Sequence, residues 1–167
     1  MRGALAVLFL SAAACRRPAP APRVFTSRVA YAPLVEALHA AGQRESDIIT
    51  VTQASQLTAL TPDRRYKFCL TAQGAFRLSP LAADTRPNEF VHPILADGAP
   101  VLTAGALSIS MQNGVLTSVT LDPESRAYCT DLGSLSAAVA ALRQRGVAPE
   151  VLHAAPRAYD CYAAPSR

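Results

Sequence analysis

The chain has 167 residues, half of them hydrophobic, and it carries a formal net charge of +4 and no tryptophan. This length fits one domain behind a short leader, with a core built from alanine, valine and leucine. The basic residues are scattered, apart from Arg16–Arg17 and the run Arg64–Lys67, and we expect them on a solvated surface. This scatter excludes the clustered basic face that is typical of a nucleic-acid-binding protein.

Residues 1–14 have the pattern of an export signal. Arg2 gives a positive start, residues 4–10 form a short apolar run, and Ala12 to Ala14 supply the small residues that a signal peptidase needs. The apolar run is much shorter than the roughly 20 residues of a membrane-spanning helix, so no protein anchor is expected. A buried N-terminal helix is the competing interpretation, but residues 4–10 have no polar face.

Cys15 makes this opening segment similar to the signal of a bacterial lipoprotein, in which a cysteine after small residues becomes the lipidated first residue. That family usually has leucine three positions before the cysteine, where this chain has Ala12, so ordinary cleavage after Ala14 remains an alternative. Residues 15–27 then form a lipid-anchored tether rich in proline and arginine. We expect residues 28–167 to form a single α+β domain in the cell envelope, facing the periplasm or the exterior.

The first elements of this domain are a helix and a strand. Residues 33–41, "PLVEALHAA", predict a short helix that begins at a proline and ends at Gly42. Residues 47–52, "DIITVT", are β-branched and predict a strand. Residues 55–63 are left open, with a helical turn ended by Thr61-Pro62 as one interpretation.

Two hairpins follow. Residues 66–71, "YKFCLT", alternate in polarity and return after a short turn as residues 75–79. Residues 101–111 and 115–121 flank Asn113-Gly114, the dipeptide that best tolerates the positive φ angles of a two-residue turn.

In the second strand of this second hairpin, one face is more apolar than the other. It carries Val115, Thr117, Val119 and Leu121, and we expect it to pack on a core.

The last predicted element is an amphipathic helix in "SLSAAVAALRQRGV". Leu135, Ala138, Val139 and Leu142 share one face, Ser134 is the expected N-cap, and Gly146 is the expected stop. The predicted fold is α+β, with a small antiparallel sheet of two hairpins and this C-terminal helix packed on one face.

Cysteine usage suggests one disulfide. With Cys15 lipidated, three cysteines remain in an oxidising compartment. We pair Cys129 with Cys161 because they flank the C-terminal helix and would pin the tail, and we place Cys69 in the core. Their spacing supports no metal or redox motif.

Residues 66–147 resemble a module found in C-terminal parts of bacterial toxins and in plant calmodulin-binding proteins with IQ motifs. The matching stretches are "YKFCLT", "HPILADGAPVLTAGALSI", "QNGVL", "RAYC" and "LRQRGV". The second histidine of the module's pattern is Ala127 here, and the serine after the first is Pro93. A site built on two histidines would therefore lack half of its residues, and calmodulin is not implied because the calmodulin-binding segment lies outside the match.

His92 is the best single candidate for chemistry, since histidine titrates near neutral pH. Tyr128, which the chain retains beside the lost histidine, would be its catalytic partner, with Asp97 or Asp131 as alternatives. In the competing interpretation His92 precedes Pro93 in a surface loop and only hydrogen-bonds its neighbours, because no base, nucleophile and orienting group occur together.

The sequence lacks nucleophile-elbow, phosphate-loop and calcium-loop motifs, and its acidic residues are too sparse for a paired-carboxylate hydrolase. It therefore predicts an exported bacterial lipoprotein whose small non-catalytic domain binds an unknown protein or small molecule. Its membrane contact is the lipid on Cys15, and no cofactor, metal or nucleic acid is expected. The alternative is a toxin-like or effector-like enzyme module that uses His92 and Tyr128.

Overall fold

The computed structural model describes residues 21–159 and residue 161. The predicted signal peptide, Cys15 and the first part of the predicted tether lie outside these residues, so export and lipidation stay predictions. In the described part of the chain, no helix is both long and apolar enough to cross a membrane.

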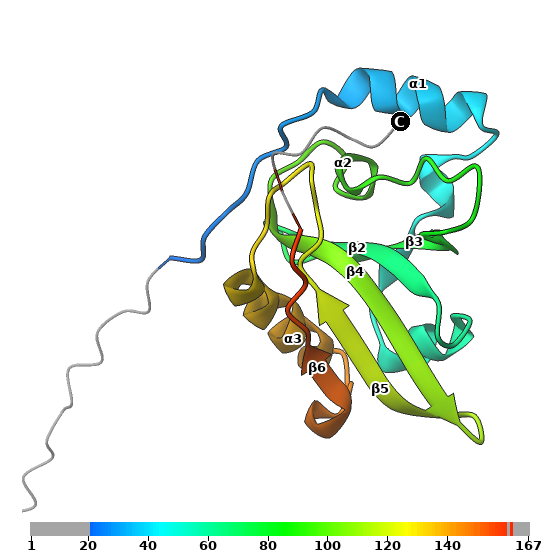
Figure 1. Cartoon of the computed structure of the whole chain (residues 1–167), viewed down its shortest axis with the longest axis vertical. Helices are drawn as coiled ribbons and strands as arrows, with labels where there is room; N and C mark the ends of the chain where they lie inside the picture. The colour runs from blue at the N-terminus through cyan, green and yellow to red at the C-terminus, as the bar shows by residue number, and fades with distance from the viewer. Residues whose placement is uncertain (1–20, 160, 162–167) are drawn as a thin grey trace, which may run out of the picture.

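A six-stranded sheet forms the centre of the fold, with strand order β1-β3-β2-β4-β5-β6 (Figure 1). The strands are β1 (Ile49–Val51), β2 (Arg65–Thr71), β3 (Phe76–Ala82), β4 (Val101–Gln112), β5 (Val115–Asp122) and β6 (Leu152–Ala154). The α-helices are α1 (Tyr31–Ala40), α2 (His92–Leu95) and α3 (Leu135–Gln144). Short 3-10 helices span Glu45–Asp47, Ala54–Ala59, Leu132–Ser134 and Pro149–Val151, and the second of them fills the segment that the sequence leaves open.

The two predicted hairpins, β2–β3 and β4–β5, form the middle of the sheet. The sheet is nevertheless larger than the small antiparallel one that the sequence predicts. β1 adds an antiparallel strand beside β3, and β6 pairs parallel with β5, with Val119 opposite Leu152. The parallel pair arises because the chain returns along α3 before β6 begins. The sheet is therefore mixed.

The predicted helix α3 packs on the sheet through the face that the sequence indicates. Leu135, Ala138 and Leu142 join a core cluster that includes Phe68 of β2 and Leu107 of β4. Phe68 also stacks on a ring of β3, with the ring centroids 5.2 Å apart. Among the described residues this cluster is the larger of two, and it fills the space between the sheet and α3, which lies in the lower half of Figure 1.

The opposite face of the sheet is covered by α1 and α2, in addition to the C-terminal helix that the sequence places on one face. Cys69 points away from its neighbour Phe68, because side chains alternate along a strand, and it joins a second cluster. That cluster includes Leu38 of α1 and Ile94 of α2. The helices α1 and α2 lie at the top of Figure 1. Phe25, inside the predicted tether, is buried there too and exchanges backbone hydrogen bonds with Val101. The folded body therefore begins before residue 28.

The turn at Asn113-Gly114 is confirmed, since both residues have positive φ angles, 52° and 78°. The expected inner face of β5 is correct at Val119 and Leu121, which are buried, and wrong at Val115, which is 65% exposed, and at Thr117, which is also exposed.

A β-bulge explains the exception at Val115. Ser110 pairs with Ser118 but Met111 pairs with Leu116, so β5 carries one extra residue at Thr117. An extra residue reverses the alternation beyond it, and Leu116 therefore packs against the core in place of Val115.

The start of α3 differs from the prediction at one residue. Ser134 makes no side-chain cap and is itself helical, because a 3-10 turn precedes α3. The cap is Asp131, whose Oδ1 accepts a hydrogen bond from the Ser134 backbone N–H at 2.9 Å. Gly146 ends the helix as predicted, with a φ of 85°.

Candidate functional site

A cavity of about 610 Å³ opens on the face of the sheet that α1 and α2 cover. Its apolar lining consists of Val29, Leu34, Ala83, Val91, Pro93, Ala106 and Ala127, and its polar lining of Arg28, Arg65, Lys67, His92, Glu124 and Arg126, with Cys161 beside them. This volume and this mixture of an apolar wall with a few polar groups are typical of a small-molecule site.

The floor of the cavity comes from two neighbouring strands. Arg65 and Lys67 lie two positions apart in β2 and therefore project from the same face of the sheet. Ala106 of β4 pairs directly with Lys67, and its small side chain leaves space above the sheet. The start of α2, the segment before α1 and the loop after β5 provide the walls.

Lys67 is the only lysine of the chain, and it is half-buried in this floor. Its Nζ donates a long hydrogen bond of 3.4 Å to the backbone oxygen of Asn88. Within residues 21–159 and 161, no carboxylate lies within the 4.0 Å of an ion pair with this ammonium group. Burial lowers the pKa of Lys67, while the charge of Glu89 raises it by a smaller amount.

Arg65, in contrast, is paired twice. Its Nη2 lies 2.7 Å from Asp122 Oδ2 and 3.1 Å from Glu124 Oε2. Glu124 is shared, because Arg157 Nε lies 2.6 Å from the same oxygen. The negative charge of Glu124 is thus already matched within this network.

His92 lies at the start of α2 and lines the cavity, as a candidate site residue should. Its Nε2 lies 2.8 Å from the backbone oxygen of Gly105, which can only accept, so Nε2 carries the proton and Nδ1 is the acceptor. Burial lowers the pKa of His92 to about 4, and the nearby charge of Lys67 acts in the same direction. The imidazole is therefore neutral at physiological pH.

Tyr128 is not among the residues that line the cavity. Its side chain belongs to the second core cluster and is 2% exposed. Its hydroxyl donates a hydrogen bond of 2.9 Å to the backbone oxygen of Ala99, and burial raises its pKa above the usual range. The structure gives Tyr128 the contacts of a core residue.

The two carboxylates proposed as alternative partners of His92 bind other groups. Asp97 accepts a hydrogen bond from the Tyr31 hydroxyl at 2.8 Å, and Asp131 caps the turn before α3 and pairs with Arg23. Neither lines the cavity.

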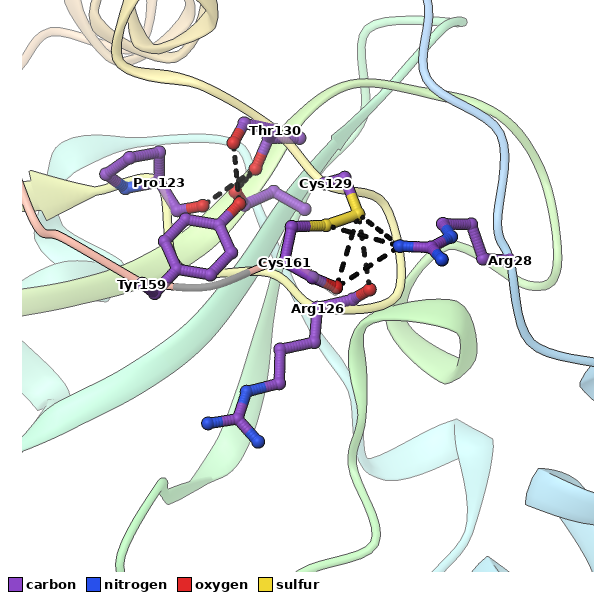
Figure 2. The surroundings of a disulfide bond; sticks show 8 residues. Arg28, Pro123, Arg126, Cys129, Thr130, Tyr159 and Cys161 are labelled. Atoms are coloured by element: carbon purple, nitrogen blue, oxygen red, sulfur yellow. Dashed lines mark hydrogen bonds between the residues drawn. A yellow bond between two sulfur atoms is a disulfide. The ribbon is translucent and has the colours of Figure 1, made fainter. Parts of the chain in front are cut away.

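One side of the cavity is closed by the disulfide that joins Cys129 to Cys161, the pair expected from the sequence, with Cα atoms 5.4 Å apart. In Figure 2 the guanidinium group of Arg28 points at this disulfide, and its Nη1 lies 3.0 Å from Cys129 Sγ. Tyr159 donates a hydrogen bond of 2.6 Å to the backbone oxygen of Thr130 and fixes the tail just before the second cysteine (Figure 2).

The cationic part of this site was missed by the sequence analysis. The run Arg64–Lys67 was expected on a solvated surface, but its residues alternate between environments. Arg64 pairs with the exposed Asp84, Tyr66 is buried in the larger core, and Arg65 and Lys67 face the cavity. The alternation in β2 indicates this placement. Tyr66 and Phe68 point to one face of the sheet, so the charged residues between and before them point to the other face, which also carries the buried Cys69.

No family model, no curated protein and no solved structure matches this chain.

Proposed function

We propose that this protein is an exported lipoprotein, held to a membrane by a lipid on Cys15, whose single domain binds a small molecule without transforming it. The observation that carries the binding role is the cavity of about 610 Å³, with apolar walls and convergent polar groups. The export role rests on the leader pattern of residues 1–14 and on the proline-rich segment behind Cys15.

A non-catalytic role is favoured by the state of His92. A general base works best with a pKa near the working pH, and the pKa of His92 is lowered to about 4. Its Nε2 is also committed to the Gly105 oxygen. The alternative, a toxin-like or effector-like enzyme that uses His92 and Tyr128, needs the buried Tyr128 hydroxyl to leave the Ala99 oxygen.

The binding role is tested by filling the cavity of the full-length chain. Ala127 lines the cavity from a loop, and Ala140 lies exposed on α3, so Ala127→Leu and Ala140→Leu form a matched pair. The probes are two amphipathic dyes, the neutral N-phenyl-1-naphthylamine and its anionic 8-sulfonate, titrated by fluorescence.

We expect saturable binding of at least one dye to the wild type and to Ala140→Leu, and binding at least about tenfold weaker to Ala127→Leu, since roughly 1.4 kcal/mol of lost contact gives that factor. Absence of saturable binding of both dyes, or equal binding by the two variants, would contradict the binding role.

The export role has a separate test. Mass spectrometry of the mature protein should find an acylated Cys15 at the N-terminus. An intact Met1 or an unmodified Cys15 would contradict lipid anchoring and leave the binding result untouched.

A further inference from the structure

We infer that the cavity selects an amphipathic acid, a molecule with one anionic head group that pairs with Lys67 and an apolar body that lies along the cavity wall. This inference rests on the proposed binding function and adds the chemical class of the ligand.

Two of the cations that line the cavity, the half-buried Lys67 and the exposed Arg126, have no carboxylate of the described residues within ion-pair distance, and Lys67 is the one that the sheet partly desolvates. Arg65 is neutralised by Asp122 and Glu124, and Glu124 is further engaged by Arg157. Lys67 has no such carboxylate within the described residues, at 21–159 and 161. An anionic group in the cavity would supply the missing partner.

The hydrogen bonding of Lys67 also favours an anionic ligand group. An ammonium group has three donors, and the structure satisfies one of them with a bond of 3.4 Å to the Asn88 oxygen. A half-buried ammonium has lost part of its hydration, and a carboxylate or sulfonate that accepts its hydrogen bonds offsets this loss. The lowered pKa of Lys67 reflects the same desolvation.

The other residues that line the cavity indicate the chemistry of the rest of the ligand. Val29, Leu34, Val91, Ala106 and Ala127 give the cavity an apolar wall that a sugar or a polyphosphate would not match. His92 is neutral and adds no charge, but its Nδ1 can accept a hydrogen bond from a ligand hydroxyl or amide. A single head group with an apolar body fits this division.

The test compares the two dyes, which differ by one sulfonate. In the full-length wild type we expect the sulfonated dye to bind about 10- to 100-fold more tightly than the neutral one, the range for a charge-assisted hydrogen bond. Lys67→Met should bring the ratio of the two affinities to within about threefold, and Lys67→Arg, which keeps the charge, should retain the preference.

A second measurement needs no variant. Because Lys67 is the only lysine, its side-chain ε-methylene gives one resolved carbon-13 resonance in the labelled protein. The sulfonated dye should shift this resonance, and the neutral dye should leave it unchanged.

The outcomes separate the two claims. If both dyes bind equally, if the preference survives in Lys67→Met or disappears in Lys67→Arg, or if saturating sulfonated dye does not move the Lys67 resonance, the acid-binding inference is wrong while the cavity remains a binding site. If neither dye binds, the proposed function itself fails.

Discussion

His92 makes the stability of this domain sensitive to acid, and the effect can be isolated by replacing it with glutamine. The His92 Nε2 proton is donated to the Gly105 oxygen, and burial holds the ring neutral. Glutamine offers a neutral N–H at a similar distance from the backbone but does not titrate. The variant His92→Gln therefore removes the titration and keeps a donor for Gly105.

The magnitude follows from the change in pKa on folding. The unfolded chain binds a proton on His92 near pH 6.5, and the folded chain does so only near pH 4. The unfolded state thus holds more protons between these values, and stability falls as the pH falls through them. At about 1.4 kcal/mol for each pH unit, the loss from this one group reaches about 3 kcal/mol at pH 4.

The assay is urea unfolding of the wild type and of His92→Gln at several values between about pH 7 and pH 4. Other groups titrate in both proteins, so the quantity to follow is the difference between the two free energies of unfolding. We expect this difference to move by about 3 kcal/mol in favour of the variant as the pH falls. A difference that stays constant across this range would refute the assignment of a buried, neutral His92.

Three other predictions concern the frame around the cavity. Removing the Cys129–Cys161 disulfide, whose cysteines are 32 residues apart, should lower the free energy of unfolding by about 4 kcal/mol in the loop-entropy estimate, and denaturant unfolding with and without reductant measures it. Gly105→Ala should lower the free energy of unfolding by about 3 kcal/mol or more, because the new Cβ would lie 1.9 Å from a backbone oxygen at the end of β5. The control Gly133→Ala, whose Cβ would have no atom nearer than 3.4 Å, should change the melting temperature little. The Lys67 ammonium should titrate below the usual lysine range in a carbon-13 pH titration, and a normal pKa would show that it is not desolvated.

The parts of the fold that were predicted correctly are those with strong local signals. The two-residue turn at Asn113-Gly114 needs positive φ angles that few other dipeptides accept, and the α3 repeat of Leu135, Ala138 and Leu142 spans about two helical turns. Each signal is contained in one short window of sequence. Neither depends on a distant partner.

The parts that were missed depend on pairing between distant residues. β6 is three residues long and is a strand because it pairs with the parallel strand β5. In the sequence, the whole of α3 separates these two strands. The bulge at Thr117 is defined by the pairing of β5 with β4, and no residue type in β5 indicates it.

The site was harder to predict from the sequence than the fold, because its residues come from separate parts of the chain. Lys67, His92 and Ala127 belong to a strand, a helix start and a loop, and they meet only after the sheet has formed. His92 could be predicted as a site residue because histidine titrates near neutral pH and is a candidate for chemistry by its type alone. Lys67 was overlooked because a lysine in a short basic run is usually solvated, and only its register against Cys69 places it inside.

The hydrogen-bonded bridge between Phe25 and Val101 fixes how far the domain can travel from its proposed anchor. Ten peptide units separate Cys15 from Phe25, and a fully extended chain of that length reaches at most about 35 Å. With a lipid on Cys15, Phe25 would stay within about 35 Å of the membrane surface, and the domain that is bonded to it would stay close to the membrane as well. Such a domain would sample molecules in the layer next to the lipid head groups and would have no access to the opposite side of a wide periplasm.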